Sequence, residues 1–208
     1  MRRFFLSLGV LAVLVPAAAQ AQWSVGARTG YAIALGDADG SAKMTDITNG
    51  QIPLQLDIGY RLQGTALTIG GYVSYGFGSV SGLTKDLCDL TGSSCSTSSF
   101  RIGAQLLYSF ADPKQQMEPW AGVGLGYDSL KLSASGGDVT TSGFEFLILQ
   151  GGIDWRLAPQ FSLGGFASFS LGQYSDISSS NGGSGTISDK KMHEWLTIGI
   201  RGAFGFGS

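Results

Sequence analysis

Apolar and polar residues alternate along most of the chain after residue 22, most clearly in the last segment, residues 194–206. The apolar positions of that segment are Leu196, Ile198, Ile200, Phe204 and Phe206. A period of two residues is typical of a β-strand that has one face in apolar surroundings. A strand at the end of a chain leaves unpaired backbone groups at a sheet edge unless it finds a partner. The segment that begins at Trp23 alternates in the same way, and pairing of the two segments would close the sheet into a barrel.

Eight segments share this pattern. The alternation predicts strands over residues 23–35, 52–62, 67–77, 100–110, 121–128, 144–156, 161–171 and 194–206. One face of these segments is apolar, and the other carries glycine, serine and a few charged residues. Segments of about ten residues with such faces are the signature of a membrane-spanning β-barrel.

The sixth segment is the least clear, because it is apolar on both faces near its start. Its polar residues Gln150, Asp154 and Arg156 cannot all face lipid. We therefore expect Leu147, Leu149, Ile153 and Trp155 to point outward. Phe146 and Ile148 then point inward, or a bulge shifts the frame.

The connections alternate in length along the chain. Residues 36–50, 80–98, 132–142 and 174–191 form long connections, and residues 63–65, 112–119 and 158–160 form shorter ones. Outer-membrane barrels have short periplasmic turns and longer outer loops. The sequence therefore predicts an all-β, eight-stranded antiparallel up-and-down transmembrane barrel with four outer loops, three periplasmic turns and both termini in the periplasm.

Periodicity alone does not say which face points outward, and a soluble barrel of the lipocalin type would turn its apolar faces inward. The glycine-rich polar faces suit a narrow lumen. Aromatic residues near strand ends suit a girdle at the membrane interface; they are Trp23, Tyr60, Trp120, Trp155 and Phe206. Both features favour the membrane barrel.

The first 21 residues have the parts of a secretory signal peptide. Arg2 and Arg3 precede an apolar run over residues 4–15, and small residues lead to an expected cleavage after Ala21. A membrane-anchoring helix is the alternative, but it would need about 20 apolar residues without Pro16 among them. We therefore divide the chain into a signal peptide, residues 1–21, and a barrel domain, residues 22–208.

Charge is sparse and slightly negative. Charged residues make up 13% of the chain, and removal of Arg2 and Arg3 leaves 11 basic against 15 acidic side chains, a net charge near −4. We therefore expect no nucleic acid as a partner. The 33 glycines are about twice the usual share. No later apolar run reaches the length of a spanning helix, so a membrane protein of this composition must be a closed barrel.

Two stretches resemble the outer-membrane β-barrel domain family, which includes small OmpX-like and OmpA-like barrels. Residues 119–127 match its strand of proline, aromatic residue, alternating glycines and tyrosine, and residues 151–164 match its second recurrent hairpin. The resemblance extends over residues 22–208 and implies an architecture, outer-membrane lipid as surroundings and recognition by the barrel-assembly machinery. Such barrels usually end on an aromatic residue, whereas Gly207 and Ser208 follow Phe206 here.

Candidate chemistry is limited. The single histidine, His193, is expected at the outer rim of the last strand, where a Ser-His-acid lipid hydrolase would have to use it. A plain rim histidine is the favoured interpretation. Asp37, Asp39 and Gly40 resemble the start of a calcium loop, but the later ligands are missing, so a solvated loop is favoured. We expect no enzyme activity, no cofactor and no metal.

The lumen is expected to hold two charge clusters. Arg28, Asp57 and Arg201 lie at similar heights on three neighbouring strands, so one carboxylate would serve two guanidinium groups. Arg101 and Asp128 lie at similar heights on two strands joined by a short turn. The alternative is that each charge sits in lumen water without a fixed partner.

The only cysteines, Cys88 and Cys95, are expected to form a disulfide within the second outer loop, because an even count in an exported protein favours pairing.

Two functions remain. The first is a monomeric structural or surface-interaction barrel with a filled lumen, whose outer loops contact an extracellular ligand. The second is a transporter or narrow pore for a small or apolar solute. Eight strands enclose little more than their own side chains, which favours the first.

Overall fold

The computed structural model describes residues 23–37, 43–82, 86, 88, 90, 95–111, 115–134 and 136–206. The predicted signal peptide, together with Asp39, Gly40, Gly207 and Ser208, lies outside the described residues. Within these ranges, no helix combines the length and the apolar character that a membrane crossing requires.

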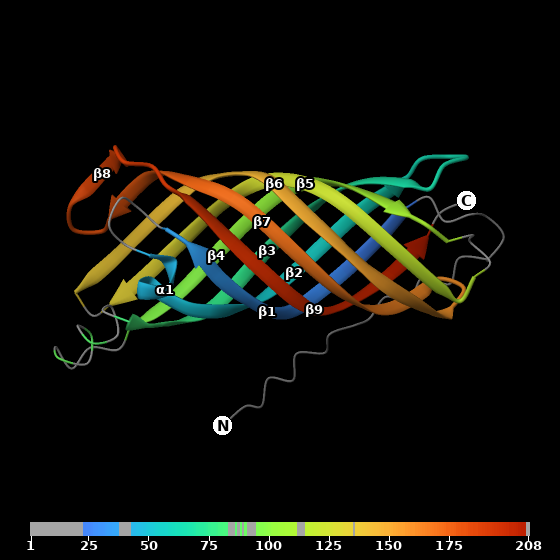
Figure 1. Ribbon diagram of the computed structural model, residues 1–208, viewed down its shortest axis with the longest axis horizontal. Helices are drawn as coiled ribbons and strands as arrows, with labels where there is room; N and C mark the ends of the chain where they lie inside the picture. Colours follow the sequence, from blue (N-terminus) through green and yellow to red (C-terminus); the bar gives the residue numbers. More distant parts are fainter. Residues whose placement is uncertain are drawn as a thin grey trace, which may run out of the picture.

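The chain folds into a closed antiparallel barrel (Figure 1). Its strands are β1 (Trp23–Gly36), β2 (Thr48–Arg61), β3 (Leu67–Val80), β4 (Ser96–Ser109), β5 (Met117–Ala134), β6 (Gly137–Ala158), β7 (Phe161–Ser179), β8 (Gly183–Thr186) and β9 (Met192–Phe206). Consecutive strands pair from β1 to β7, and β9 pairs with both β7 and β1, so that Trp23 lies opposite Phe206. Eight strands thus form the wall, as the sequence predicts, and β8 pairs only with β7 beyond it.

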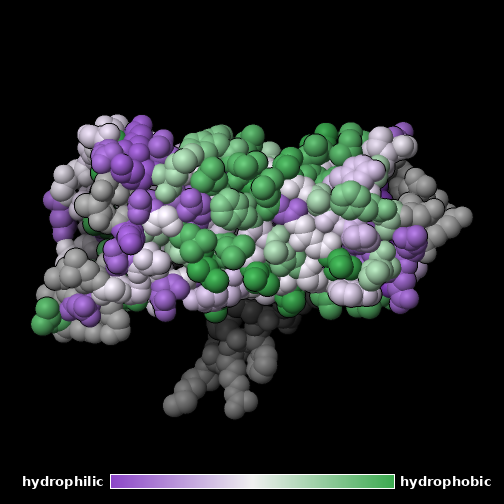
Figure 2. All heavy atoms as spheres, in the orientation of Figure 1, coloured by the Kyte–Doolittle hydropathy of each residue, from purple (hydrophilic) through white to green (hydrophobic). Residues whose placement is uncertain are grey.

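The apolar face of every wall strand points outward. This apolar belt includes one residue from each wall strand that is at least 42% exposed, namely Val25, Leu56, Ile69, Ile102, Val123, Leu149, Leu163 and Ile198. Figure 2 shows the belt across the middle of the molecule, with hydrophilic residues toward both ends and more of them at the end that carries β8. This surface is suited to a hydrocarbon solvent and not to water.

The structure shows the second of the two alternatives predicted for Phe146, a bulge in β6. Leu125 of β5 faces two residues, Phe146 and Leu147, where the register shifts between Gly124 and Gly126. Both residues of the bulge point outward, with exposures of 41% and 37%. Ile148 points inward as expected. The extra residue lets the strand keep apolar residues toward lipid on both sides of the shift, and it turns Glu145 into the lumen.

Two of the predicted outer loops are largely strand. β5 and β6 continue as a hairpin until Ala134 pairs with Gly137, and β7 continues to Ser179 before turning back into β8. Residues 139–142 pair with both β5 and β7. Their side chains are mostly small and polar on both faces, so they lack the apolar alternation that marks the other strands.

The connection between β1 and β2 contains the short helix α1 (Met44–Ile47), which lies at the same end of the barrel as β8 (Figure 1). We call this the loop end, and the end with Trp23 and Phe206 the terminal end. In the connection between β3 and β4 a disulfide joins Cys88 to Cys95, as the sequence predicts, and their Cα atoms are 6.2 Å apart. At the terminal end, the short turns between β2 and β3 and between β6 and β7 lie where the sequence places them.

We expect detergent-solubilised protein to show β-type circular dichroism and to migrate faster on a denaturing gel when it is not heated. A closed barrel has no free edge from which detergent can unravel it, so the unheated protein stays compact. Circular dichroism and paired heated and unheated lanes provide the measurement. A helical spectrum, or identical migration in both lanes, would contradict the closed barrel.

Candidate functional site

The lumen is filled by polar and aromatic side chains that lie in layers from the terminal end to the loop end. The layer nearest the terminal end centres on Glu118 of β5. Its carboxylate lies 2.9 Å from Arg61 Nη2 and 3.0 Å from Arg156 Nη2, and Ser109 donates a hydrogen bond to it at 2.5 Å. Both arginine side chains keep about 30% of their surface exposed, at 32% and 27%. This layer is therefore partly hydrated.

The next layer contains Arg28 and Asp57, two of the three residues that the sequence groups together. Arg28 Nε lies 2.7 Å from Asp57 Oδ2, and both side chains are buried. Two glutamines complete this layer: Gln105 donates to Asp57 at 2.9 Å, and Gln150 accepts from Arg28 at 2.5 Å. A buried ion pair is tolerated only when its remaining donors and acceptors are satisfied, and these amides do so.

Arg201 does not share the carboxylate of Asp57, which corrects the predicted cluster. Its Nη1 atom lies 3.3 Å from Asp154 Oδ2 instead. Asp57 already accepts hydrogen bonds from Arg28, Gln55 and Gln105. Asp154 projects into the lumen from β6. Gly164 of β7 pairs with Asp154 on one side and with Arg201 of β9 on the other, so the two charged residues face each other across one strand.

Trp120 lies in this layer and not in the interface girdle, which is a second correction. It is 5% exposed, and its Nε1 donates to Asp154 at 3.2 Å. The guanidinium groups of Arg28 and Arg201 lie 5.3 and 4.5 Å from its ring centroid. An aromatic face attracts cations at this distance, so Trp120 holds both arginines across the barrel.

A second charge cluster lies closer to the loop end, and the sequence identified two of its members. Arg101 lies 3.4 Å from Asp128 and 3.5 Å from Glu145. Tyr72 donates a 3.5 Å hydrogen bond to Glu145. The sequence pattern does not place Glu145 in this cluster, because strict alternation without the bulge at Phe146 and Leu147 directs its side chain toward lipid.

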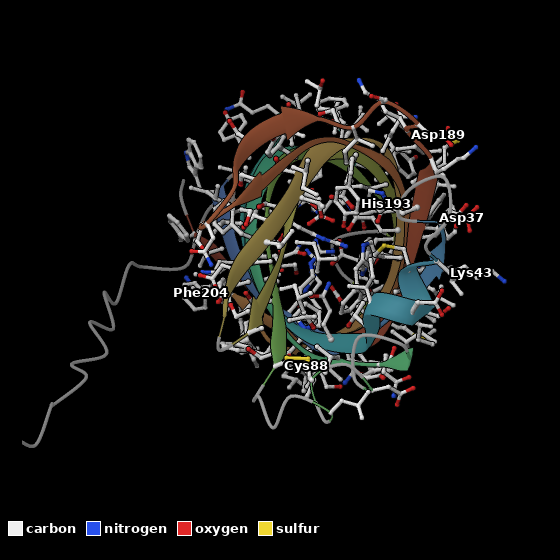
Figure 3. The ribbon with its side chains drawn as sticks, turned by 90° about the vertical axis from the view of Figure 1, so that its left-hand side faces the viewer. Asp37, Lys43, Cys88, Asp189, His193 and Phe204 are labelled. Atoms are coloured by element: carbon white, nitrogen blue, oxygen red, sulfur yellow. A yellow bond between two sulfur atoms is a disulfide. The ribbon has the colours of Figure 1, made fainter. Side chains whose placement is uncertain are left out.

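His193 belongs to this second cluster and does not lie on an exposed rim. It is 1% exposed and points inside the ring of strands (Figure 3). Its ring stacks on Tyr174 with 3.9 Å between centroids, and its Nε2 atom lies 3.7 Å from Asp128 Oδ2. Tyr174 donates to the same carboxylate at 3.1 Å. The neighbouring Glu194 alternates to the other face of β9, as the sequence indicates.

An apolar cap covers the second cluster at the loop end. Met44 of α1 is fully buried against Ala34, Tyr174 and Trp195, and Ile47 and Ile187 pack beside it. Met44 and Ile47 are the two long apolar side chains in the otherwise polar connection between β1 and β2, and this isolated pair was the only sequence signal for the cap. The cap excludes water from the ion pairs below it.

Acidic, histidine and cysteine side chains do not gather in threes as a metal site would need, among the residues that the structure describes. A small cavity of about 10 Å³ opens toward the terminal end between Asp57, Gln105 and Arg201. This volume holds roughly one water molecule. Asp37 forms a β-bridge with Lys43 at the rim, and the rest of the predicted acidic loop is outside the described residues.

Comparison with known proteins assigns the barrel to a family. Residues 5–195 match the family model of the outer membrane protein beta-barrel domain. The chain belongs to this family. A comparison with curated protein sequences found no significant match. Family membership and fold together locate the protein in the outer membrane.

Solved structures with the same fold share little sequence with this family member. Neisserial surface protein A superposes with a TM-score of 0.57 at 15% identity, covering 88% of this chain and 97% of that one. A major outer membrane protein of Thermus thermophilus gives 0.56 at 13% identity, over 90% and 100%. OprG of Pseudomonas aeruginosa gives 0.51 at 15%, over 90% and 98%. At these identities the likeness concerns the fold alone.

Proposed function

We propose that this protein is a structural or surface-interaction barrel of the outer membrane whose lumen does not conduct solutes. The observation that carries the proposal is the continuous filling of the lumen, from the Glu118 layer to the cap formed by Met44. Both termini then lie in the periplasm, and α1 and β8 face the outside. The barrel acts as a monomer whose belt contacts lipid, whose last strand meets the assembly machinery and whose outer segments meet an extracellular ligand.

The inward glycines do not leave a channel, because large side chains occupy the space beside them. A methyl group added at Gly103 or Gly126 would approach the Tyr72 ring or hydroxyl to 2.6 and 2.3 Å. One added at Gly152 would approach Trp120 to 2.9 Å. The glycines therefore make room for aromatic rings that block the lumen, which argues against the pore.

A lipid hydrolase based on His193 is also disfavoured by the geometry. The imidazole lies beneath the cap, and its acidic neighbour is the fully buried Asp128. A general base must reach the proton that it abstracts, and a lipid ester in the surrounding membrane has no path to this ring.

The closed lumen is tested in planar bilayers. We expect no stable stepwise conductance from the native protein. The double variant Tyr72→Ala, Trp120→Ala removes two blocking rings and should raise the frequency of open events, which shows that the assay detects a lumen of this size. Stable stepwise conductance from the native protein would contradict the proposal and favour the pore.

A further inference from the structure

The second charge cluster carries more negative than positive side chains. Asp128 and Glu145 are both fully buried, and Arg101 is the single arginine that contacts them among the described residues. In the next layer Arg28 pairs with Asp57, and Arg201 with Asp154, so neither arginine is free to serve this cluster. An uncompensated buried charge is costly, and a second positive charge is therefore needed here.

Each of the two carboxylates has one hydrogen-bond donor and shares Arg101. Tyr174 donates a hydrogen bond to Asp128, and Tyr72 donates one to Glu145. Arg101 lies against both carboxylates and also 5.0 Å from the ring centroid of Trp195. The other oxygen of each carboxylate, Asp128 Oδ1 and Glu145 Oε1, lies near Arg101 but has no hydrogen-bond partner among the described residues. One guanidinium therefore leaves negative charge in this cluster without full compensation.

His193 is the remaining group that can supply the charge. On β9 it lies between Gly36 of β1 and Gly172 of β7, neither of which titrates. The titratable groups that reach its ring are Asp128 of β5 and Tyr174 of β7, and Arg101 and Glu145 stand behind Asp128. Glu194, next to it on β9, points to the opposite face.

We propose that His193 is a proton-binding site and sits in the lumen as an imidazolium ion, the second cation of the cluster. Its Nε2 atom faces Asp128 Oδ2 at ion-pair distance, 3.7 Å, and the π face of Tyr174 covers the ring, an arrangement that also favours a cation. Because Tyr174 and Trp195 belong to both the cluster and the cap, this proton also supports the closure of the loop end. The proposal is independent of whether the barrel conducts solutes.

The protonation state can be observed directly, because His193 is the only histidine in the chain. Protein labelled with ¹⁵N-histidine and purified without a histidine tag is reconstituted in lipid nanodiscs. Ring ¹H–¹⁵N spectra at pH 7.5 should show two protonated nitrogens, whereas an exposed histidine is largely neutral at this pH. The variant Glu145→Gln removes one negative charge and should shift the ring toward the neutral form. A neutral ring in the native protein at pH 7.5 would overturn the proposal.

A second measurement does not depend on the folding of the Glu145 variant. The folded protein keeps the His193 proton, whereas the unfolded chain releases it above about pH 7. The free energy of unfolding therefore decreases as the pH rises. The unfolding equilibrium constant of the native protein should increase by up to tenfold per pH unit between the pH at which the unfolded histidine loses its proton and the higher pH at which the folded protein loses it. The variant His193→Gln should lack this increase. An equal slope in both proteins, or a slope accompanied by a neutral ring, would assign the proton elsewhere and reject the proposal.

Discussion

Replacement of Arg101 by methionine is expected to destabilise the barrel by about 3 to 5 kcal/mol, the cost of leaving buried partners unpaired. Asp128 and Glu145 are both fully buried, and both lose their arginine in this variant. Methionine keeps much of the length of the side chain, so the loss reports charge more than volume. Equilibrium unfolding in urea from lipid vesicles, at a fixed pH, provides the measurement.

The part of the β5–β6 hairpin at the loop end supplies a matched control. Lys131 and Asp138 form a 2.6 Å ion pair between exposed side chains, and the hydrogen bond from Lys131 holds the pKa of Asp138 below its usual range. Lys131→Met should change stability far less than Arg101→Met does, because solvent screens exposed pairs. A double-mutant cycle between Arg101→Met and Asp128→Asn should show coupling. Strictly additive effects would mean that this pair does not hold the lumen together.

The second large effect is expected for Gly199→Ala, which should destabilise the protein by about 1 to 3 kcal/mol through overpacking. Gly199 of β9 lies opposite Gly30 of β1, where the first and last strands close the barrel. A methyl group there would approach the carbonyl oxygen of Thr29 to 2.1 Å and the ring of Phe166 to 2.9 Å. A backbone carbonyl cannot move aside as a flexible side chain can, so the pairing of β1 with β9 itself must shift. The urea midpoint of the variant measures the effect.

Gly202→Ala is the control on the same strand. Its added methyl group would meet nothing nearer than Phe161, at 3.7 Å. Alanine also lowers the conformational entropy of the unfolded chain, so this variant should be neutral or slightly more stable. Equal losses in the two variants would indicate a general cost of alanine in β9 and would refute the steric account of the seam.

The sequence by itself determined the wall of the barrel. Each side chain in a strand has only two directions, and a hydrocarbon solvent requires one of them to be apolar, so the alternation in segments such as residues 194–206 defines both strand and face. Closure followed because unpaired backbone is intolerable in lipid. The same reasoning brought Arg28 to Asp57 and Arg101 to Asp128, since each pair lies at matching heights on adjacent strands.

The tertiary structure alone decided the contacts that cross the lumen. Arg201 meets Asp154, and Arg101 meets Glu145, through offsets between strands and through the bulge in β6, which the sequence left open as one of two alternatives. Met44 reaches the cap from a connection without periodicity. His193, which the sequence placed at the exposed rim, is a buried neighbour of Asp128, because the cap covers it. Alternation specifies which face a residue occupies, whereas its partner across a closed barrel depends on register, tilt and the folding of the outer segments, which no local pattern records.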